Sequence, residues 1–505
     1  MKRQQEEFPR LSQVTPSIPV EKRPASTTAG SDQGTRADPA PTSGKPGAAQ
    51  TGGRPEANNP TGHGLSAIAA QLFQRARLLG GQADYQGALI ACNQVVAMAP
   101  NNVDVLHVKA DLLYRLDRYE QALPVIVKVL RFAPAKADYF QLRAGILIAM
   151  GRFSQGLQDQ DKAAELAPDD PTIRAGRALT YLRLGHFAKG WEDYHWRFLE
   201  PTLVNAGFKK PDFPAWTPKC QAKGVLIWRE QGIGEDLFFG SLLAEASAFG
   251  SAVYARIDER LLPLFMRSVP GIHFITRQTV LRRRDIDAQL PMGDLGKYLR
   301  PDPEALKRHQ GHYLRPDAQR VEHFKKQLSE PGRLTVGVSW RSQNQKQGTL
   351  NKAKSLDLMA LKPLLALPQV NAVNLQYGEV QPEIDHLFQS TGLRVRNDHG
   401  VDLFNDIDGL AALAAACDVV VTSSSVTAHI AGALGKKGWV LLPKGRNRFW
   451  FWHVEDGPSP WYPSLTLVTQ SAPGDWSEAV LKVRDALLCE PCPTSPDGPH
   501  SGGRR

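Results

Sequence analysis

The sequence predicts an α + α/β fold, in which an N-terminal helical solenoid of repeats is followed by two lobes built on parallel sheets. Two observations lead to this prediction. Small, aromatic and proline residues recur every 34 residues in the first part of the chain. From residue 224 onward, short apolar runs alternate with segments of helical periodicity, which is the pattern of strands joined by crossover helices.

The repeats are expected over residues 63–200, in about four units. The positions in register are Ala76, Ala110, Ala144 and Ala178; Tyr85, Tyr119, Phe153 and Phe187; Ala88, Ala122, Gly156 and Gly190; and Pro100, Pro134 and Pro168. Small side chains let paired helices approach, and proline ends a helix. A period of 34 with these positions is the tetratricopeptide signature. Such a stack presents a groove, in which we expect a partner protein or peptide to bind.

Three segments lack the pattern of a folded domain. Residues 1–62 have almost no aromatic or branched aliphatic side chains, so they cannot bury enough surface to offset the entropy of ordering, and we expect a disordered tail. Residues 201–223 are expected to form a linker, and residues 489–505 a second disordered tail. The chain shows no secretory signal and no apolar stretch long enough to span a bilayer, so we expect a cytoplasmic protein.

Composition narrows the function classes. A chain of 505 residues exceeds one ordinary core, and five cysteines do not make an extracellular disulfide framework. The formal net charge is +10, but the basic residues are scattered, so we expect no nucleic-acid partner. A mildly basic protein suits an anionic small substrate such as a nucleotide sugar.

The two lobes are expected over residues 224–330 and 331–488, with a cleft between them. Predicted strands lie at 225–228, 253–257 and 272–276 in the first lobe, and at 335–340, 372–375, 419–422 and 439–442 in the second. The first strand is followed by a glycine-containing loop and a helix predicted over 237–249. Ligands of doubly wound sheets bind at the carboxyl ends of the strands, so these loops are the candidate sites.

The loop after the first strand contains Gly232 and Gly234, followed by Glu235 and Asp236. The glycines allow the backbone to approach a ligand closely. The two carboxylates stand at the start of a helix, where acidic residues often serve only as caps. Alternatively, one of them is a general base that takes the proton from an acceptor hydroxyl.

The strand at 419–422 of the second lobe leads into serines, a threonine and a small-residue helix that contains His429. Free backbone N–H groups and hydroxyls at a helix N-terminus form a ready anion site, into which a pyrophosphate would fit. Plain N-capping is the alternative. Residues 444–453 interleave arginine with aromatic rings, which could stack on bases, but we expect most of these rings to pack in the interior.

No metal site is expected. The Asp-x-Asp triplets at 285–287 and 406–408 could hold a divalent cation. The second triplet precedes an apolar helix, however, where carboxylates cap and complement the helix dipole. Cys489 and Cys492 lack the second pair that a zinc tetrahedron requires.

The chain resembles bacterial tetratricopeptide-repeat glycosyltransferases whose C-terminal region is a GT-B, heptosyltransferase-like (glycosyltransferase family 9-like) pair of Rossmann-like lobes. The segments that carry the resemblance occur in the expected order over residues 224–488. They are 230–234, 337–341, 374–379, 402–406, 428–435 and 459–463.

The resemblance implies transfer of a sugar from a nucleotide donor, with inversion and without a metal or other cofactor, to an acceptor beside the first lobe. It implies donor binding by Gly232, Gly234, Arg341, Lys352, Lys354, Gln376, Ser424, Ser425, Thr427, Ala428 and His429. The relatives place an aspartate directly after the Gly-x-Gly, whereas this chain has Glu235 and then Asp236. The base is therefore open between these two residues, and loss of activity is a further alternative.

Three functions follow from these observations. The first is a glycosyltransferase that modifies a protein recruited by the repeats, with flagellin-like acceptors as one example in similar architectures. The second is a transferase of cell-surface polysaccharide or lipopolysaccharide, in which the repeats serve assembly. The third is a catalytically inactive repeat scaffold, because a fold alone does not establish an activity.

Overall fold

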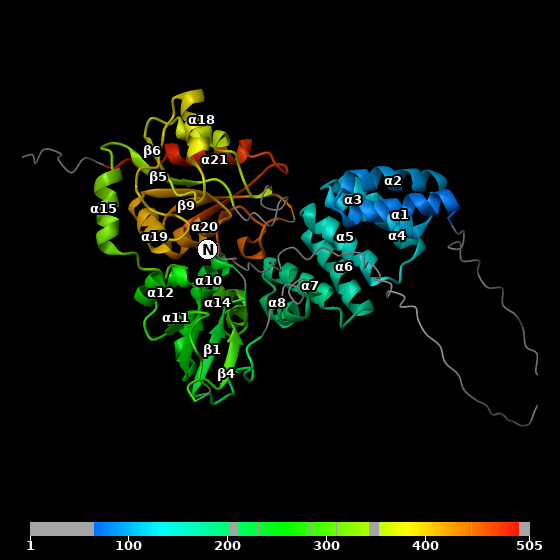
Figure 1. Cartoon of the computed structure of the whole chain (residues 1–505), viewed down its shortest axis with the longest axis horizontal. Helices are drawn as coiled ribbons and strands as arrows, with labels where there is room; N and C mark the ends of the chain where they lie inside the picture. The colour runs from blue at the N-terminus through cyan, green and yellow to red at the C-terminus, as the bar shows by residue number, and fades with distance from the viewer. Residues whose placement is uncertain are drawn as a thin grey trace, which may run out of the picture. The chain divides into compact units, whose positions relative to one another are not determined.

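The computed structural model describes residues 65–201, 210–230, 232–282, 284–309, 311–342, 353–445 and 447–493 (Figure 1). The tail expected at 1–62, part of the expected linker and residues 494–505 lie outside these ranges. The chain divides into two compact units. One covers Thr15–Pro134, and the other covers Ala135–Arg505 together with Met1–Val14.

The described part of the first unit consists of two helix pairs. Its helices are α1 (Ala67–Gly81), α2 (Tyr85–Met98), α3 (Val103–Arg115) and α4 (Tyr119–Phe132). The register alanines Ala76, Ala88, Ala110 and Ala122 are fully buried. Ser66, Asp84 and Asn102 cap three of the helices by accepting backbone N–H groups. The predicted repeat pattern is confirmed in these pairs.

Two further helix pairs open the second unit. They are α5 (Ala137–Ala149), α6 (Phe153–Leu166), α7 (Pro171–Arg183) and α8 (Phe187–Tyr194), and α8 continues into the 3-10 turn η2 (His195–Leu199). A β-carbon added to Gly156 would lie 2.6 Å from Ile148, and one added to Gly190 would lie 2.7 Å from Leu182. The glycines of the register are therefore required where these helices touch.

Lobe 1 has a four-stranded parallel sheet of order β3-β2-β1-β4. Its elements are β1 (Gly224–Trp228), α10 (Ile233–Gly240), α11 (Leu243–Ala246), η3 (Ser247–Phe249), β2 (Ala252–Arg256), η4 (Glu259–Leu261), α12 (Leu262–Ser268), β3 (His273–Ile275), β4 (Ala288–Pro291), η5 (Met292–Asp294), α13 (Leu295–Leu299) and α14 (Pro303–Lys307). The strand order reverses between β1 and β4, so the carboxyl ends of these two strands flank the crevice where a ligand is expected.

Lobe 2 has a seven-stranded sheet of order β10-β11-β9-β8-β5-β6-β7, in which β10 pairs antiparallel. Its elements are α15 (Ala318–Leu328), β5 (Leu334–Ser339), η6 (Leu358–Leu361), α17 (Lys362–Leu365), β6 (Val370–Asn374), α18 (Gln381–Thr391), β7 (Val395–Arg396), α19 (Ile407–Ala416), β8 (Val419–Ser423), α20 (Val426–Ala433), β9 (Gly438–Leu442), η7 (Trp450–Trp452), β10 (Gly457–Pro458), β11 (Leu465–Thr469) and α21 (Ser477–Leu488). Here the order reverses between β5 and β8. Because Arg320 of α15 pairs with Asp406 at the start of α19, we count α15 with lobe 2, although the sequence placed the boundary after residue 330.

One apolar core joins the last repeat to both lobes. It includes Trp191 of α8, Phe238 of α10 and Ile430 of α20. Val420 belongs to this core, whereas its neighbour Val421 belongs to a second one, because successive strand residues point to opposite faces of a sheet. The predicted order of helical repeats followed by parallel-sheet α/β structure is confirmed.

Candidate functional site

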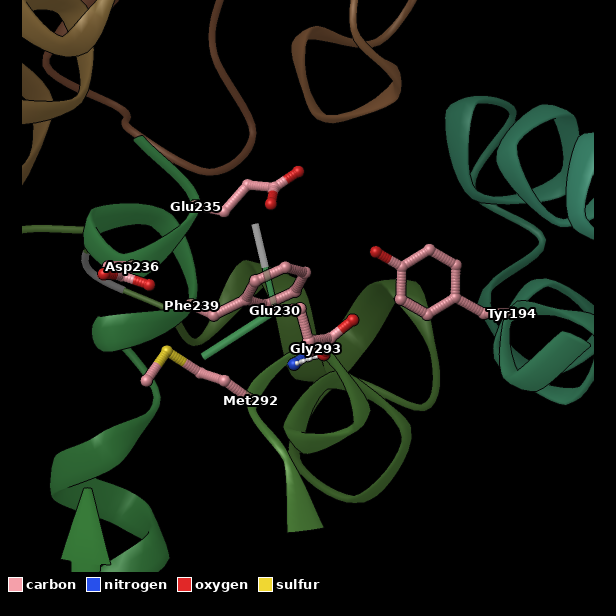
Figure 2. Close-up of a pocket in the computed structure, with 7 residues that line it drawn as sticks. All are labelled: Tyr194, Glu230, Glu235, Asp236, Phe239, Met292 and Gly293. Carbon is pink, nitrogen blue, oxygen red and sulfur yellow. Dashed lines mark hydrogen bonds between the residues drawn. The ribbon is translucent and has the colours of Figure 1, made fainter. Parts of the chain in front are cut away.

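A pocket with about 220 Å³ of empty space lies at the reversal point of lobe 1 (Figure 2). Loops after β1 and β4 form it, together with the end of the last repeat helix. The lining residues are Tyr194, Glu230, Glu235, Asp236, Phe239, Met292 and Gly293. The described lining thus contains three carboxylates and no lysine or arginine.

Glu230 does not face a ligand, because Arg197 of η2 engages it. The Arg197 guanidinium contacts both carboxylate oxygens, with Nε to Oε2 at 2.6 Å and Nη2 to Oε1 at 2.8 Å. It also lies 2.7 Å from Asp294 and is fully buried. Gly293 N–H donates to Glu230 Oε1 at 2.8 Å. The buried bidentate ion pair between Arg197 and Glu230 therefore joins the end of the repeats to lobe 1.

Asp236 is buried, and its carboxylate is held by groups of lobe 1. Arg229 Nε lies 2.9 Å from Asp236 Oδ2, and Asp258 N–H donates to the same oxygen at 3.1 Å. Burial raises the pKa of Asp236 to about 6, against the lowering effect of Arg229. In Figure 2 its side chain points away from the side of the pocket that Glu235 faces.

Glu235 is half-buried in the first turn of α10. Figure 2 shows its carboxylate directed toward the space that the Tyr194 hydroxyl also faces. Glu235 is therefore the better placed of the two candidate bases to meet an acceptor hydroxyl. Gly232, which precedes α10, has the extended backbone of an N-cap residue.

Tyr194 is the residue of the repeats that lines the pocket. Its side chain is 4% exposed. The Arg197 guanidinium lies 4.0 Å from the centre of its ring, and a β-carbon on Gly293 would lie 3.1 Å from Tyr194 Cε1. Burial raises the pKa of Tyr194 well above its ordinary value, so the phenol keeps its proton near neutral pH.

The loop of lobe 1 meets the helix α20 of lobe 2. A β-carbon added to Gly234 would lie 3.3 Å from the His429 ring. His429 is buried, stacks on Trp452 at 5.4 Å between ring centres, and its Nδ1 lies 3.1 Å from the Tyr462 hydroxyl. The candidate acceptor loop and the candidate donor helix are therefore adjacent.

The predicted donor residues at the start of α20 are buried among other groups of lobe 2. Trp452 Nε1 donates to the Ser424 hydroxyl at 2.9 Å. Ser425 is the N-cap of α20, and its hydroxyl lies 3.3 Å from that of Thr422. Thr427 donates to the Leu375 carbonyl at 3.3 Å, and Ala428 is part of the apolar core.

Gln376 and Arg341 tie the neighbouring loops of lobe 2 together. Gln376 Oε1 accepts from Trp340 N–H at 3.0 Å and from Arg341 N–H at 2.8 Å. Arg341 Nη2 donates to the Glu379 carbonyl at 2.6 Å, and its guanidinium pairs with Glu383. These groups lie at the carboxyl ends of β5 and β6.

Of the two predicted lysines, Lys354 is buried with its ammonium 3.7 Å from the centre of the Phe449 ring, a cation–π contact. Lys352 lies outside the described residues.

The aromatic residues after β9 pack in the interior, as expected. Trp450, Phe451 and Trp452 are buried. Trp450 meets Trp191 of α8 edge to face at 5.7 Å between ring centres, and Phe238 of α10 at 5.5 Å. This aromatic cluster therefore joins the last repeat, lobe 1 and lobe 2.

The contribution of η2, η5 and β4 to the site was not evident from the sequence. The only signal for η2 was an arginine between two aromatic residues, at the end of the last repeat. Met292 and Gly293 follow β4, whose sequence Ala-Gln-Leu-Pro does not resemble a central strand. Nothing in the spacing indicated that these segments meet Glu230.

The aspartates of the two Asp-x-Asp triplets bind protein groups. Asp406 caps α19 and pairs with Arg320, and Asp408 pairs with Arg267. Asp287 accepts the Lys223 and Gly224 backbone N–H groups at 3.0 and 3.3 Å. Within the described ranges, no group of three histidine, cysteine or acidic side chains could hold a metal ion.

None of the helices that the structure describes is both long and apolar enough to cross a membrane.

Comparisons with known proteins agree with the repeats. Residues 81–146 match the family described as tetratricopeptide repeat. Protein FlbA of Caulobacter vibrioides is 30% identical over 315 residues, which cover 59% of this chain and 51% of FlbA. The chain thus spans about half the length of this curated relative.

Solved structures with similarity cover about a quarter of the chain. MamA from Desulfovibrio magneticus RS-1, residues 41 to the end, is 21% identical with a TM-score of 0.24, covering 28% of this chain and 78% of that one. A thermophilic tetratricopeptide-repeat protein of Thermus thermophilus is 21% identical with a TM-score of 0.25, covering 28% and 80%.

Proposed function

We propose that this chain is a glycosyltransferase that moves a sugar from a nucleotide-sugar donor to a hydroxyl of a protein acceptor. The observation that supports this best is the adjacency of two reversal points. The pocket beside Glu235 lies in lobe 1, and its loop meets the N-terminal part of α20 in lobe 2 at Gly234 and His429. A donor in lobe 2 would thus be within reach of an acceptor in lobe 1.

In the proposed reaction, the acceptor oxygen forms a bond to the anomeric carbon of the sugar. The bond from that carbon to the phosphate oxygen breaks, and its electron pair leaves on the nucleotide. The acceptor proton moves to the Glu235 carboxylate. Backbone N–H groups at the start of α20, and cations such as Arg341 and Lys354, would stabilise the charge that develops on the leaving group.

A protein acceptor is favoured over an anionic polysaccharide or lipid. The Glu235 carboxylate is directed into the pocket, where it disfavours a phosphate or carboxylate on the acceptor. Tetratricopeptide repeats supply a surface for a protein or peptide. A flagellin-like protein is one acceptor of this kind. Because nucleotide sugars are the donors, we place the reaction in the cytoplasm.

The test uses the full chain, a panel of UDP-, GDP-, dTDP- and CMP-linked sugars, and the flagellin of the source organism as acceptor. Intact mass is expected to increase by one sugar unit with at least one donor. Glu235→Gln should lower the transfer rate about 100-fold or more, the range for loss of a general base, while calorimetry shows unchanged binding of the nucleotide.

Glu259→Gln is the matched control, since Glu259 is an exposed carboxylate of lobe 1 outside the pocket. It should transfer at the rate of the unchanged chain. Transfer that survives Glu235→Gln undiminished would reject Glu235 as the base.

A second candidate function is a repeat scaffold whose lobes no longer catalyse a reaction. One observation favours it. The Ser424, Gln376 and Arg341 side chains at the edge of lobe 2 already engage protein groups. The scaffold function predicts that UDP, GDP, dTDP and CMP all fail to bind the full chain in calorimetry.

A further inference from the structure

The pocket of lobe 1 is completed by a side chain of the repeats. Tyr194 is the last residue of α8, and it lines the pocket together with residues after β1 and β4. The repeats therefore do more than flank this site, because one wall of the pocket belongs to them (Figure 2).

The position of Tyr194 is fixed from several directions. The Arg197 guanidinium lies 4.0 Å from the centre of its ring, and the ring meets Trp191 at 5.5 Å and Trp450 at 6.5 Å between centres. The ring also approaches Gly293 closely. A β-carbon at Gly293 would lie 3.1 Å from the Tyr194 ring, so a larger residue there would displace the ring. These contacts hold the Tyr194 ring beside the loops after β1 and β4.

The Tyr194 hydroxyl has no hydrogen bond to any residue that the structure describes, although the side chain is 4% exposed. Figure 2 shows it directed into the pocket. A hydroxyl that faces a pocket can donate to a water or a ligand there. Because burial raises the pKa of Tyr194, the phenol is a hydrogen-bond donor at neutral pH.

The size and the lining of the pocket define which chemical group can bind in it. Its enclosed space accommodates about one water-sized group, so a single hydroxyl fits there, but a sugar ring or a nucleotide sugar does not. Phe239 and Met292 supply apolar walls, and Glu235 supplies a carboxylate that accepts a hydrogen bond. A neutral hydroxyl that enters the pocket matches these features.

We propose that Tyr194 is a positioning residue of the acceptor site, where its hydroxyl donates to the oxygen of a serine or threonine side chain whose proton faces Glu235. The proposal rests on the proposed function for the identity of the pocket as the acceptor site. It adds the substrate class, an uncharged hydroxyl side chain of a protein, and it makes the last repeat part of the site.

The test measures binding to the full chain in the absence of any nucleotide sugar. The probes are N-acetyl-threonine methylamide, the valine analogue that replaces the hydroxyl with a methyl group, and the O-phosphothreonine analogue. Saturation-transfer NMR titrations give a dissociation constant for each. The threonine probe should bind more tightly than the valine probe, and the phosphothreonine probe should bind more weakly than both.

Tyr194→Phe should weaken binding of the threonine probe about fivefold, as for loss of one neutral hydrogen bond, and leave that of the valine probe unchanged. Tyr181→Phe is the control, because Tyr181 donates to Asp161 at 2.7 Å outside the pocket. It should bind all probes as the unchanged chain does. Glu235→Gln provides a second measurement, since it should improve binding of the phosphothreonine probe.

Equal binding of the threonine probe by Tyr194→Phe and the unchanged chain would overturn the proposal. So would phosphothreonine binding as tight as that of threonine. Because no donor is present, an absence of sugar transfer alongside the expected binding pattern would reject the proposed function alone.

Discussion

The reversal points of the two sheets differ in what fills them. In lobe 1, the loops after β1 and β4 leave a small pocket that the repeats complete with Tyr194. In lobe 2, side chains at the corresponding edge bind one another, as Ser424 does with Trp452 and Gln376 does with the backbone of Arg341. The topology places a candidate site at each edge, but side chains from other elements decide whether a pocket remains open.

The ion pairs at the two sheet edges differ in how far their side chains are exposed to solvent. The side chains of Arg197 and Glu230 are 0% and 7% exposed, whereas those of Arg341 and Glu383 are 19% and 31% exposed. Loss of the Arg197 guanidinium should therefore affect stability differently from loss of the Arg341 guanidinium. In lobe 1 it leaves the buried Glu230 carboxylate without a counter-charge, and in lobe 2 water can reach the Glu383 carboxylate that remains.

The largest effect is expected from Arg197→Met. It leaves Glu230 and Asp294 uncompensated, and should lower the free energy of unfolding by about 3–5 kcal/mol. Arg341→Met should change it by no more than about 1 kcal/mol. Urea unfolding of both variants measures the comparison. Equal effects would show that burial does not distinguish the two pairs.

The next effect concerns Asp236 and the dependence of stability on pH. Its pKa is raised to about 6 from the ordinary 3.8, so the folded state binds the proton more tightly than the unfolded state. This contribution favours folding below pH 3.8 and is lost as pH rises to about 6. The contribution of Asp236 to the free energy of unfolding should therefore fall by about 3 kcal/mol over this window, while carboxylates with a lowered pKa, such as Glu245 and Asp406, contribute in the opposite direction.

Asp236→Asn should remove this fall, and Glu259→Gln should keep it. Thermal unfolding at half-unit steps of pH measures both variants. A fall of the same size in Asp236→Asn would assign the titration to another group.

A smaller effect is expected at the contact of the last repeat with lobe 1. A β-carbon on Gly296 would lie 2.3 Å from the Trp191 ring, so Gly296→Ala should destabilise the chain by about 2 kcal/mol. Gly81→Ala is the control, since nothing lies within 4 Å of a β-carbon there. The melting temperatures of the two variants and of the unchanged chain measure this effect. An unchanged melting temperature for Gly296→Ala would contradict the close contact between Trp191 of α8 and Gly296.

The smallest effect is expected in lobe 2. Ser424→Ala removes the acceptor of the Trp452 N–H group and should lower the free energy of unfolding by about 1 kcal/mol. Urea unfolding at pH 7 measures it. A stabilised variant would indicate that the hydroxyl serves a ligand rather than the fold.

Much of the fold could be predicted from the sequence because its signals are local. The register residues are buried as the period requires, and β1, β8 and β9 each lie within one residue of the predicted strands. The helix predicted over 237–249 is instead divided into α10, α11 and η3. Ser241 and Leu242 separate α10 from α11, and Ser247 begins the 3-10 turn.

The pocket could not be predicted in the same way, because distant segments form it. β4 has only four residues, among them the buried Gln289, which accepts the Trp228 indole N–H. Without β4 the reversal point of lobe 1 cannot be located. Tyr194 belongs to a different part of the sequence, and its approach depends on Gly293, for which no spacing rule exists.

The most direct test of the shared pocket compares two rates in the same reaction. With a nucleotide sugar that the full chain turns over, transfer to the protein acceptor and hydrolysis of the donor by water are measured for the unchanged chain and Tyr194→Phe. Transfer is expected to fall about fivefold, as for loss of one neutral hydrogen bond, while hydrolysis stays constant. If both rates fall together, or if neither changes, Tyr194 does not position the acceptor.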